Sequence, residues 1–181
     1  MQVSGSKSSE QLRMTVYASL LAALTAAGAY LSIPIGPVPI VLQNLFILLA
    51  GLLLGSRWGL ASVSIYLLAG TCGLPVFAGG LGGIGRILGP TGGYLVGYLP
   101  AVYVVGFISE RTGQRAVFDL IAMVCGSVIV YMSGVAWLKL LTGMTLGKTL
   151  TVGVLPFLPG DALKIAAALA IATALRPIIK A

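Results

Sequence analysis

Long apolar runs, separated by short segments rich in glycine, proline or charge, dominate the pattern of this chain. Six such runs are present, at residues 12–32, 38–54, 58–72, 91–109, 116–138 and 158–175. A helix that crosses the hydrocarbon core of a bilayer needs about 20 apolar residues, with a range of about 17–25. The second and third runs are short for straight spans, so we expect them to be tilted, broken or extended into the flanking loops. The pattern predicts six membrane-spanning helices.

The apolar runs are continuous, which favours helices over the strands of a membrane barrel. Only helices and closed barrels satisfy every backbone polar group inside a bilayer, and barrel strands alternate between apolar and polar residues. We therefore expect an all-α integral membrane protein, a six-helix bundle that covers residues 1–181 as one membrane domain. The first run is longer than the apolar core of a signal peptide, about 7–15 residues. We expect it to be retained as a helix, with a cleaved signal as the alternative.

The composition agrees with lipid as the surroundings of the chain. Of its 181 residues, 58% are apolar and 8% are charged, whereas soluble domains contain about 45–50% apolar and about 25% charged residues. The 11 basic residues are scattered singly between the apolar runs, without the patch that binds nucleic acid. Because the chain has no histidine and no CxxC pair, we expect no metal site and no histidine-based catalysis.

The basic residues are distributed unequally between the two sides of the membrane. If six runs cross it, seven basic residues lie on one side and four on the other. The seven are Lys7, Arg13, Arg57, Arg111, Arg115, Arg176 and Lys180, and the four are Arg86, Lys139, Lys148 and Lys164. Since cytoplasmic loops carry the excess of Lys and Arg, we expect both termini to be cytoplasmic and the long connections 73–90 and 139–157 to lie outside.

Three charged residues on the expected outer side are candidates for chemistry: Arg86, Asp161 and Lys164. A charge at membrane depth costs about 2.5–3.5 kcal/mol on the insertion scale, so such side chains face a cavity or one another. Asp161 and Lys164 are three residues apart and share one helix face. We expect a pocket open to the outside and roofed by the apolar, Gly-rich segment 73–90. The alternatives are an Asp161 that caps its helix, a Lys164 that snorkels to the interface and an Arg86 that pairs with lipid headgroups.

Two nucleotide-binding motifs are matched only in part. Residues 80–85 fit GxGxxG, but they follow no strand, and no acidic residue lies about 20 positions further on. Residues 143–149 resemble a P-loop, but three residues separate the glycines where the motif requires four. We therefore expect that this chain binds no nucleotide, and that any ATP which powers transport is bound by another subunit.

Small residues recur in the first apolar run. Ala18, Ala22 and Ala26 are spaced by four residues, a pattern that lets a second helix approach closely. The pattern fits two interpretations equally, namely packing inside the bundle and a docking face for a partner protein.

Four stretches together carry a family resemblance. They are Gly36-Pro37-Val38-Pro39 with Gln43, residues 73–80, residues 89–95, and Leu158-Pro159-Gly160-Asp161 with Lys164. Their order and spacing resemble BioY, the biotin-specific S component of energy-coupling factor (ECF) transporters, and the resemblance covers about residues 12–176. It implies a non-enzymatic, six-helix protein of a prokaryotic plasma membrane that binds biotin tightly from outside. It also implies a transmembrane T component and two ABC-type ATPases as partners, with no cofactor in this chain.

The resemblance also implies which residues hold the ligand. Residues at positions like Arg86, Tyr94, Asp161 and Lys164 hold the vitamin, and Ala18, Ala22 and Ala26 match a small-residue pattern that docks the T component. Ligand chemistry adds detail to these roles: Arg86 and Lys164 suit the carboxylate, Tyr94 adds a hydroxyl donor, and Asp161 suits a ureido N–H.

Three further side chains are candidates from ligand chemistry alone. Gln43 or Asn44 suits the ureido carbonyl or an N–H, and Phe77 suits the wall around the ring. The Gly-rich segment 73–90 is expected to move as a lid.

Other functions stay open at this point. The chain can be an S component for another vitamin, such as thiamin or riboflavin, or a solitary transporter or facilitator that needs no ATPase. An intramembrane enzyme and a purely structural membrane protein are further alternatives. Two outer bases against one outer acid favour an anionic ligand over the thiamin cation, and the absence of a nucleophile–base pair in the sequence speaks against an enzyme.

Overall fold

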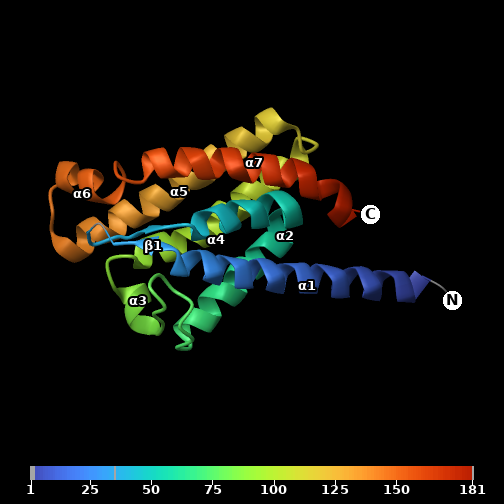
Figure 1. Ribbon diagram of the computed structural model, residues 1–181, viewed down its shortest axis with the longest axis horizontal. Helices are drawn as coiled ribbons and strands as arrows, with labels where there is room; N and C mark the ends of the chain where they lie inside the picture. Colours follow the sequence, from blue (N-terminus) through green and yellow to red (C-terminus); the bar gives the residue numbers. More distant parts are fainter. Residues whose placement is uncertain (1–2, 35, 181) are drawn as a thin grey trace.

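The computed structural model of the protein describes residues 3–34 and 36–180, and the side chains of residues 8–34 and 36–179. Among the basic residues counted above, the side chains of Lys7 and Lys180 therefore lie outside the description. The elements, in chain order, are α1 (Val3–Tyr30), β1 (Ser32–Ile33), β2 (Ile40–Val41), α2 (Gln43–Thr71), α3 (Ile84–Leu88), α4 (Gly92–Arg111), α5 (Ala116–Thr142), α6 (Leu146–Gly153) and α7 (Leu158–Lys180). Figure 1 shows α1 starting and α7 ending at one end of the bundle, the terminal end, with β1, α3 and α6 at the other, the loop end.

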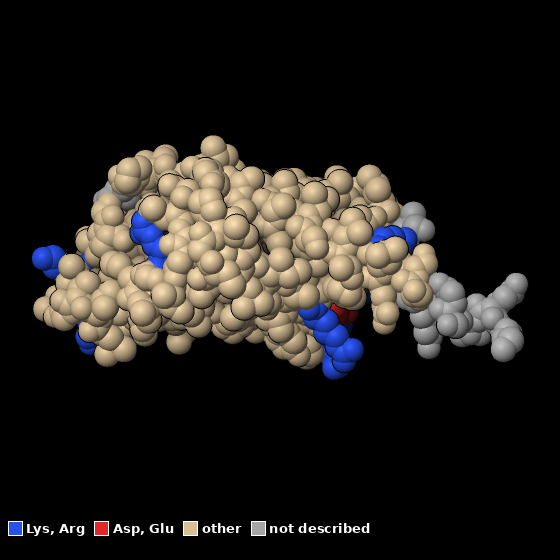
Figure 2. Space-filling view, turned by 90° about the horizontal axis from the view of Figure 1, so that it is seen from below, with Lys and Arg blue, Asp and Glu red and all other residues tan. Residues whose placement is uncertain are grey.

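Five of the described helices are long and apolar enough to cross a membrane, namely α1 over Ser8–Tyr30, α2, α4, α5 and α7 over Leu158–Ile179. The prediction of an all-helical membrane fold is confirmed, with one short strand pair added. On the face that Figure 2 shows, Lys and Arg lie toward the two ends of the molecule and the middle carries no charged side chain. A band of this kind suits the hydrocarbon core of a bilayer, where charges are costly.

Helix α2 contains most of both short apolar runs, and Gly55 divides it into two arms, residues 43–54 and 56–71. Gly55 has φ of 79° and ψ of −173°, a conformation that glycine adopts without steric cost. The Glu110 carboxylate accepts hydrogen bonds from the Ser56 backbone N–H at 3.0 Å and from the Ser56 hydroxyl at 2.8 Å, so it caps the second arm. At about 1.5 Å per residue each arm is roughly 18–24 Å long, shorter than the bilayer core of about 30 Å.

The second apolar run does not begin as a helix, which corrects the predicted span 38–54. Pro37 and Pro39 lack a backbone N–H and restrict the residues before them to extended conformations. The chain instead forms an antiparallel hairpin in which Ser32 pairs with Val41 and Ile33 with Ile40. The first helical residue after it is Gln43.

The two arms of α2 form the centre of the bundle, where they pack against α1, α4 and α7, while α5 packs mainly on α4. The first arm runs from the loop end to the terminal end, and the second returns (Figure 1). Fully buried side chains from both arms and from α4 form the core, among them Leu52, Val63, Val102 and Val105. This arrangement brings the first turns of α2 and α4 together at the loop end.

A buried ion pair ties four helices together at the terminal end. Arg176 Nη1 on α7 lies 2.5 Å from Asp119 Oδ2 on α5, and the Ser109 hydroxyl on α4 donates to the other Asp119 oxygen at 2.6 Å. Arg176 Nη2 also donates to the Leu52 carbonyl of α2 at 3.3 Å. The other ion pair among the described residues, between Asp161 and Lys164, lies at the opposite end, beside a cavity.

Candidate functional site

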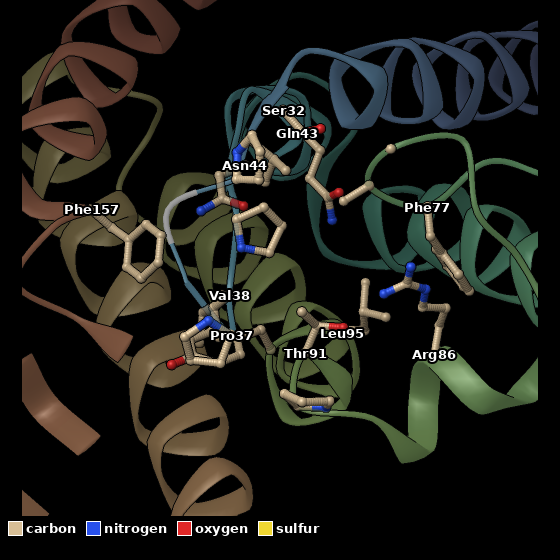
Figure 3. A pocket seen from close by; sticks show the side chains of 18 of the residues that line it. Ser32, Pro37, Val38, Gln43, Asn44, Phe77, Arg86, Thr91, Leu95 and Phe157 are labelled. Carbon is tan, nitrogen blue, oxygen red and sulfur yellow. The ribbon is translucent and has the colours of Figure 1, made fainter. Parts of the chain in front are cut away.

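A cavity of about 410 Å³ opens at the loop end of the bundle. Segments from most of the chain line it: the β1–β2 hairpin, the start of α2, the segment from Phe77 to Arg86, the first turns of α4, side chains of α5 and α7, and the loop between α6 and α7. Figure 3 shows Arg86 and Phe77 on one side of the cavity and Phe157 on the other. The volume falls within the range of about 300–1,000 Å³ for small-molecule pockets.

The structure brings the predicted site residues together at this cavity. Six of the seven line it, namely Gln43, Asn44, Phe77, Arg86, Tyr94 and Lys164. The seventh, Asp161, lines a smaller cavity of about 20 Å³ next to it, together with Asn44, Tyr98 and Tyr131. We call Asn44, Tyr98, Tyr131, Asp161 and Lys164 the polar floor of the site.

Asp161 and Lys164 form a buried ion pair within the polar floor. Lys164 Nζ lies 2.8 Å from Asp161 Oδ1, and each side chain is 10% exposed. The Tyr131 hydroxyl donates to the other carboxylate oxygen. Asp161 therefore does not cap the backbone of α7, and Lys164 does not reach out to the membrane surface. The two opposite charges neutralise each other within the floor.

Arg86 has a different environment. It lies on the short helix α3 and is half-buried, and its guanidinium makes no hydrogen bond or ion pair within the described part of the chain. Since Lys164 is paired, Arg86 contributes the uncompensated charge among the described lining residues. A guanidinium binds a carboxylate or phosphate through two parallel hydrogen bonds. The cavity therefore combines an apolar wall, a neutral polar floor and one available cation.

The hydroxyl groups of the tyrosines around the cavity donate hydrogen bonds to acceptors of the protein. Tyr94 donates to the Gly153 carbonyl at 2.8 Å and Tyr98 to Asn44 Oδ1 at 2.7 Å, while Tyr66 donates to Gln43 Oε1 at 3.3 Å. The expectation that Tyr94 supplies a hydroxyl donor does not fit this arrangement, because a tyrosine has one hydroxyl proton. Its oxygen remains available as an acceptor.

Sequence reasoning did not select two residues of the polar floor, Tyr98 and Tyr131. A signal for Tyr98 was present, because it follows Tyr94 by four residues and shares its helix face. Tyr131 lies within a long apolar run, and nothing in the sequence near it indicates a partner 30 residues away at Asp161.

Both the Gly-rich segment 73–90 and the β1–β2 hairpin line the cavity. The Gly-rich segment folds back onto the bundle as expected, but it is anchored: the Tyr30 hydroxyl donates to the Pro75 carbonyl at 2.5 Å, and the Gly83 N–H donates to the Gly70 carbonyl at 2.7 Å. The Phe77 ring lies so close to Gly70 that a Cβ there would be 2.2 Å from the ring. Six lining residues come from the Gly-rich segment, and seven more come from the hairpin and its turn, from Ser32 to Val41.

The family assignment follows from comparison with known proteins. The BioY family model matches residues 2–181 of the chain. The chain belongs to the BioY family. The prediction drawn from the four sequence stretches is therefore confirmed.

Curated BioY proteins resemble the chain over most of their length. The "Probable biotin transporter BioY" of Pyrococcus horikoshii is 42% identical over 158 residues, which are 87% of this chain and 93% of that protein. The "Biotin transporter BioY" of Thermotoga maritima is 38% identical over 165 residues, 91% of this chain and 96% of that protein. A crystal structure of the S component for biotin from an ECF-type ABC transporter superposes with a TM-score of 0.88 at 34% identity and covers 93% of each chain.

The alanines that were matched to the docking pattern of BioY proteins lie inside the bundle. Ala18 is 1% exposed and Ala22 is 6% exposed, and both belong to the core, with Ala26 packed against it. Of the two interpretations of this pattern, packing inside the bundle agrees with the burial of Ala18 and Ala22. A docking face formed by these two alanines does not agree with it. The exposed face of α1 carries another small-residue series at the same spacing, Ser19, Ala23 and Ala27.

Proposed function

We propose that the chain is the biotin-binding S component of an ATP-driven ECF importer and that it takes biotin from the side of the membrane where the loop end lies. The names of the curated relatives and the solved S component for biotin support this function. The observation in the site that carries the proposal is the unpaired Arg86 beside a charge-neutral polar floor.

The two ends of biotin suit the two polar parts of the cavity. Biotin has a neutral ureido ring with two N–H donors and one carbonyl, fused to an apolar thioether ring, and a carboxylate at the end of an alkyl chain. We propose that the polar floor holds the ureido ring, and that Arg86 binds the carboxylate. Phe77, Gln43 and the apolar lining surround the rest. In this assignment Lys164 serves the floor through its ion pair with Asp161, and Tyr94 contributes its oxygen as an acceptor.

The charge balance of the cavity argues against thiamin and riboflavin. Asp161 is the acidic residue of the site, and Lys164 neutralises it at 2.8 Å, so no carboxylate remains to bind the thiamin cation. Riboflavin is uncharged and would leave Arg86 without a partner. A monocarboxylate such as biotin satisfies the single available cation.

In the membrane we propose six crossings within one domain, with the two arms of α2 as separate, short spans. Both termini then lie in the cytoplasm of a prokaryote, in agreement with the excess of basic residues on that side. A transmembrane T component and two ABC-type ATPases complete the importer, and the ATPases bind the ATP. No cofactor is assigned to this chain.

The exposed face of α1 is the surface that we propose for the T component. Its small residues Ser19, Ala23 and Ala27 are accessible, and small residues allow close contact between helices in a bilayer. This face replaces the buried Ala18 and Ala22. A solitary facilitator is the alternative, and uptake of biotin by cells that lack the coupling subunits would support it.

The test of the function is calorimetric titration of the detergent-purified chain with biotin, with thiamin as the control. We expect tight binding of one biotin per chain and no heat of binding with thiamin. Thiamin binding without biotin binding would assign a different vitamin, and binding of neither would contradict the proposed function while leaving the fold unaffected.

A further inference from the structure

The short helix that carries Arg86 is held in place without burying its side chains. Helix α3 has five residues and none of them is buried, with Ile84 60% and Leu88 59% exposed. A helix this short has little stability of its own, and apolar burial adds little to it here. The position of Arg86 therefore depends on the contacts at the two ends of α3.

Hydrogen bonds to two other helices hold these ends. Just before α3, the Gly83 N–H donates to the Gly70 carbonyl of α2 at 2.7 Å. Just after it, Trp137 of α5 donates its Nε1–H to the Gly89 carbonyl at 2.9 Å. The same carbonyl accepts from the Gly92 N–H at 3.0 Å, so one oxygen joins the end of α3 to both α4 and α5.

The indole of Trp137 is itself fixed against the first turn of α4. A Cβ on Gly93 would lie 2.3 Å from the Trp137 Cβ, and one on Gly92 would lie 3.2 Å from Nε1. Glycine at both positions thus lets the side chain reach the backbone. One turn earlier on α5, the Ser133 hydroxyl donates to the Gly93 carbonyl at 2.7 Å. The N–H of Trp137 therefore has a defined direction toward the end of α3.

The connection that Trp137 holds, residues 89–91, forms part of the cavity wall. Arg86 lies one turn before it, Pro90 and Thr91 belong to it, and all three line the cavity (Figure 3). Trp137 is not among the described residues of the lining, and its single N–H is used by Gly89. Any effect of this N–H on a ligand therefore passes through the residues that it holds.

We propose that Trp137 is a positioning residue, whose Nε1–H holds the end of α3 so that the Arg86 guanidinium meets the ligand's carboxylate. The proposal rests on the proposed function and adds to it a residue of α5 that acts through α3. Two parallel hydrogen bonds between guanidinium and carboxylate require one orientation of the pair. Loss of the N–H lets α3 shift, which lowers the affinity for a carboxylate and spares an uncharged ligand of the same shape.

Trp137→Phe removes the N–H and keeps an aromatic ring. The Gly89 carbonyl retains its hydrogen bond from Gly92, so the change leaves no acceptor without a donor. Trp58→Phe is the matched control, because Trp58 is the other tryptophan of the chain and lies outside the cavity lining. Thermal unfolding in detergent shows whether each variant is folded.

A second form of the test deletes the N–H without changing the shape of the side chain. The analogue 3-benzothienylalanine has sulfur where tryptophan has the indole N–H. Its incorporation in place of tryptophan into the Trp58→Phe protein alters position 137 alone. This protein decides the matter if Trp137→Phe does not fold.

Calorimetric titration with biotin and with the primary amide of biotin gives the ratio of the two affinities for each protein. The native protein and Trp58→Phe should prefer biotin to the same extent. We expect this preference to fall about three- to tenfold in Trp137→Phe and in the analogue-containing protein, the effect of one hydrogen bond. In an Arg86→Met background Trp137→Phe should change neither affinity, because its effect passes through Arg86.

Three results would overturn the inference while biotin binding by the native protein keeps the proposed function. They are an unchanged ratio in the folded proteins that lack the N–H, an equal loss for biotin and its amide, and a further loss in the Arg86→Met background. A native protein that binds biotin and its amide alike would also overturn it. If the native protein binds no biotin, the proposed function fails and this inference fails with it.

Discussion

Replacement of Arg86 by methionine isolates the contribution of one charge to ligand binding. Arg86 lines the cavity, and its guanidinium has no partner within the described part of the chain. Its removal therefore breaks no hydrogen bond or ion pair within the described part of the chain, unlike removal of Lys164, which would leave Asp161 without its cation. Methionine keeps a flexible apolar side chain of similar length. The variant should fold like the native protein and differ from it in carboxylate binding.

The magnitude follows from the contacts that are lost. Hydrogen bonds to charged groups contribute about 1.5–3 kcal/mol, which corresponds to a factor of about 10–150 in Kd. Arg86 is half-buried, so solvent screens part of the attraction. We expect a loss of affinity for biotin near the lower bound, about 10- to 30-fold.

Calorimetric titration with biotin and with the primary amide of biotin provides the assay. The amide is uncharged, so the native protein should bind it more weakly than biotin by a similar factor, and Arg86→Met should bind both ligands alike. Arg86→Lys retains a charge but cannot form two parallel hydrogen bonds. Its affinity for biotin should therefore lie between that of the native protein and that of Arg86→Met. Lys148→Met removes an exposed basic residue of α6 that is outside the cavity lining and controls for the overall charge.

Two results would refute this reasoning. An unchanged affinity of Arg86→Met for biotin would mean that the carboxylate lies elsewhere in the cavity. An equal loss for biotin and its amide would mean that Arg86 shapes the cavity without reading the charge.

The remaining predictions concern the terminal end and the exposed face of α1. Asp119→Asn or Arg176→Met alone should lower the free energy of unfolding by about 3–5 kcal/mol, whereas replacing both with apolar residues should cost much less, because a single change leaves a buried charge unpaired. Thermal unfolding in detergent measures the stability of the single and double variants. A double variant whose loss equals the sum of the two single losses would contradict this prediction. Ala23→Trp should prevent co-purification with the T component and ATPases while sparing biotin binding, whereas Ala22→Trp, in the core, should lower thermal stability. Undiminished co-purification of Ala23→Trp would exclude this face as the docking surface.

Local properties of the sequence predicted the membrane class and most helix positions. The length of an apolar run is itself the physical requirement for a helix in lipid, because each backbone group must be satisfied within its own segment. The break at residues 55–57 was visible from Gly55 and the following Ser and Arg. The predicted start of this helix, residue 38, was wrong by several residues, since α2 begins at Gln43. A prediction from apolar residues alone ignores the effect of Pro37 and Pro39 on the backbone.

The candidate site was predictable in its membership but less so in its roles. Charged and amide side chains are rare in this chain, so few candidates had to be considered, and six of the seven selected residues line the cavity. Their roles depend on partners that the sequence does not reveal. Asp161 neutralises the charge of Lys164. The Tyr94 hydroxyl donates its hydrogen bond to the carbonyl of Gly153, 59 residues away.

The sequence by itself determined that this chain is an integral membrane protein, that it resembles the BioY family, and which polar residues are candidates for the site. Tertiary structure alone decided that Ala18 and Ala22 face inward, that the hairpin also lines the cavity, and that Tyr98 and Tyr131 belong to its floor. The physical reason is the range of the interactions. Insertion into a bilayer depends on consecutive residues, whereas the donors and acceptors of the site are paired across 30 residues at Tyr131 and Asp161 and across 54 at Tyr98 and Asn44, through the packing of α2, α4, α5 and α7.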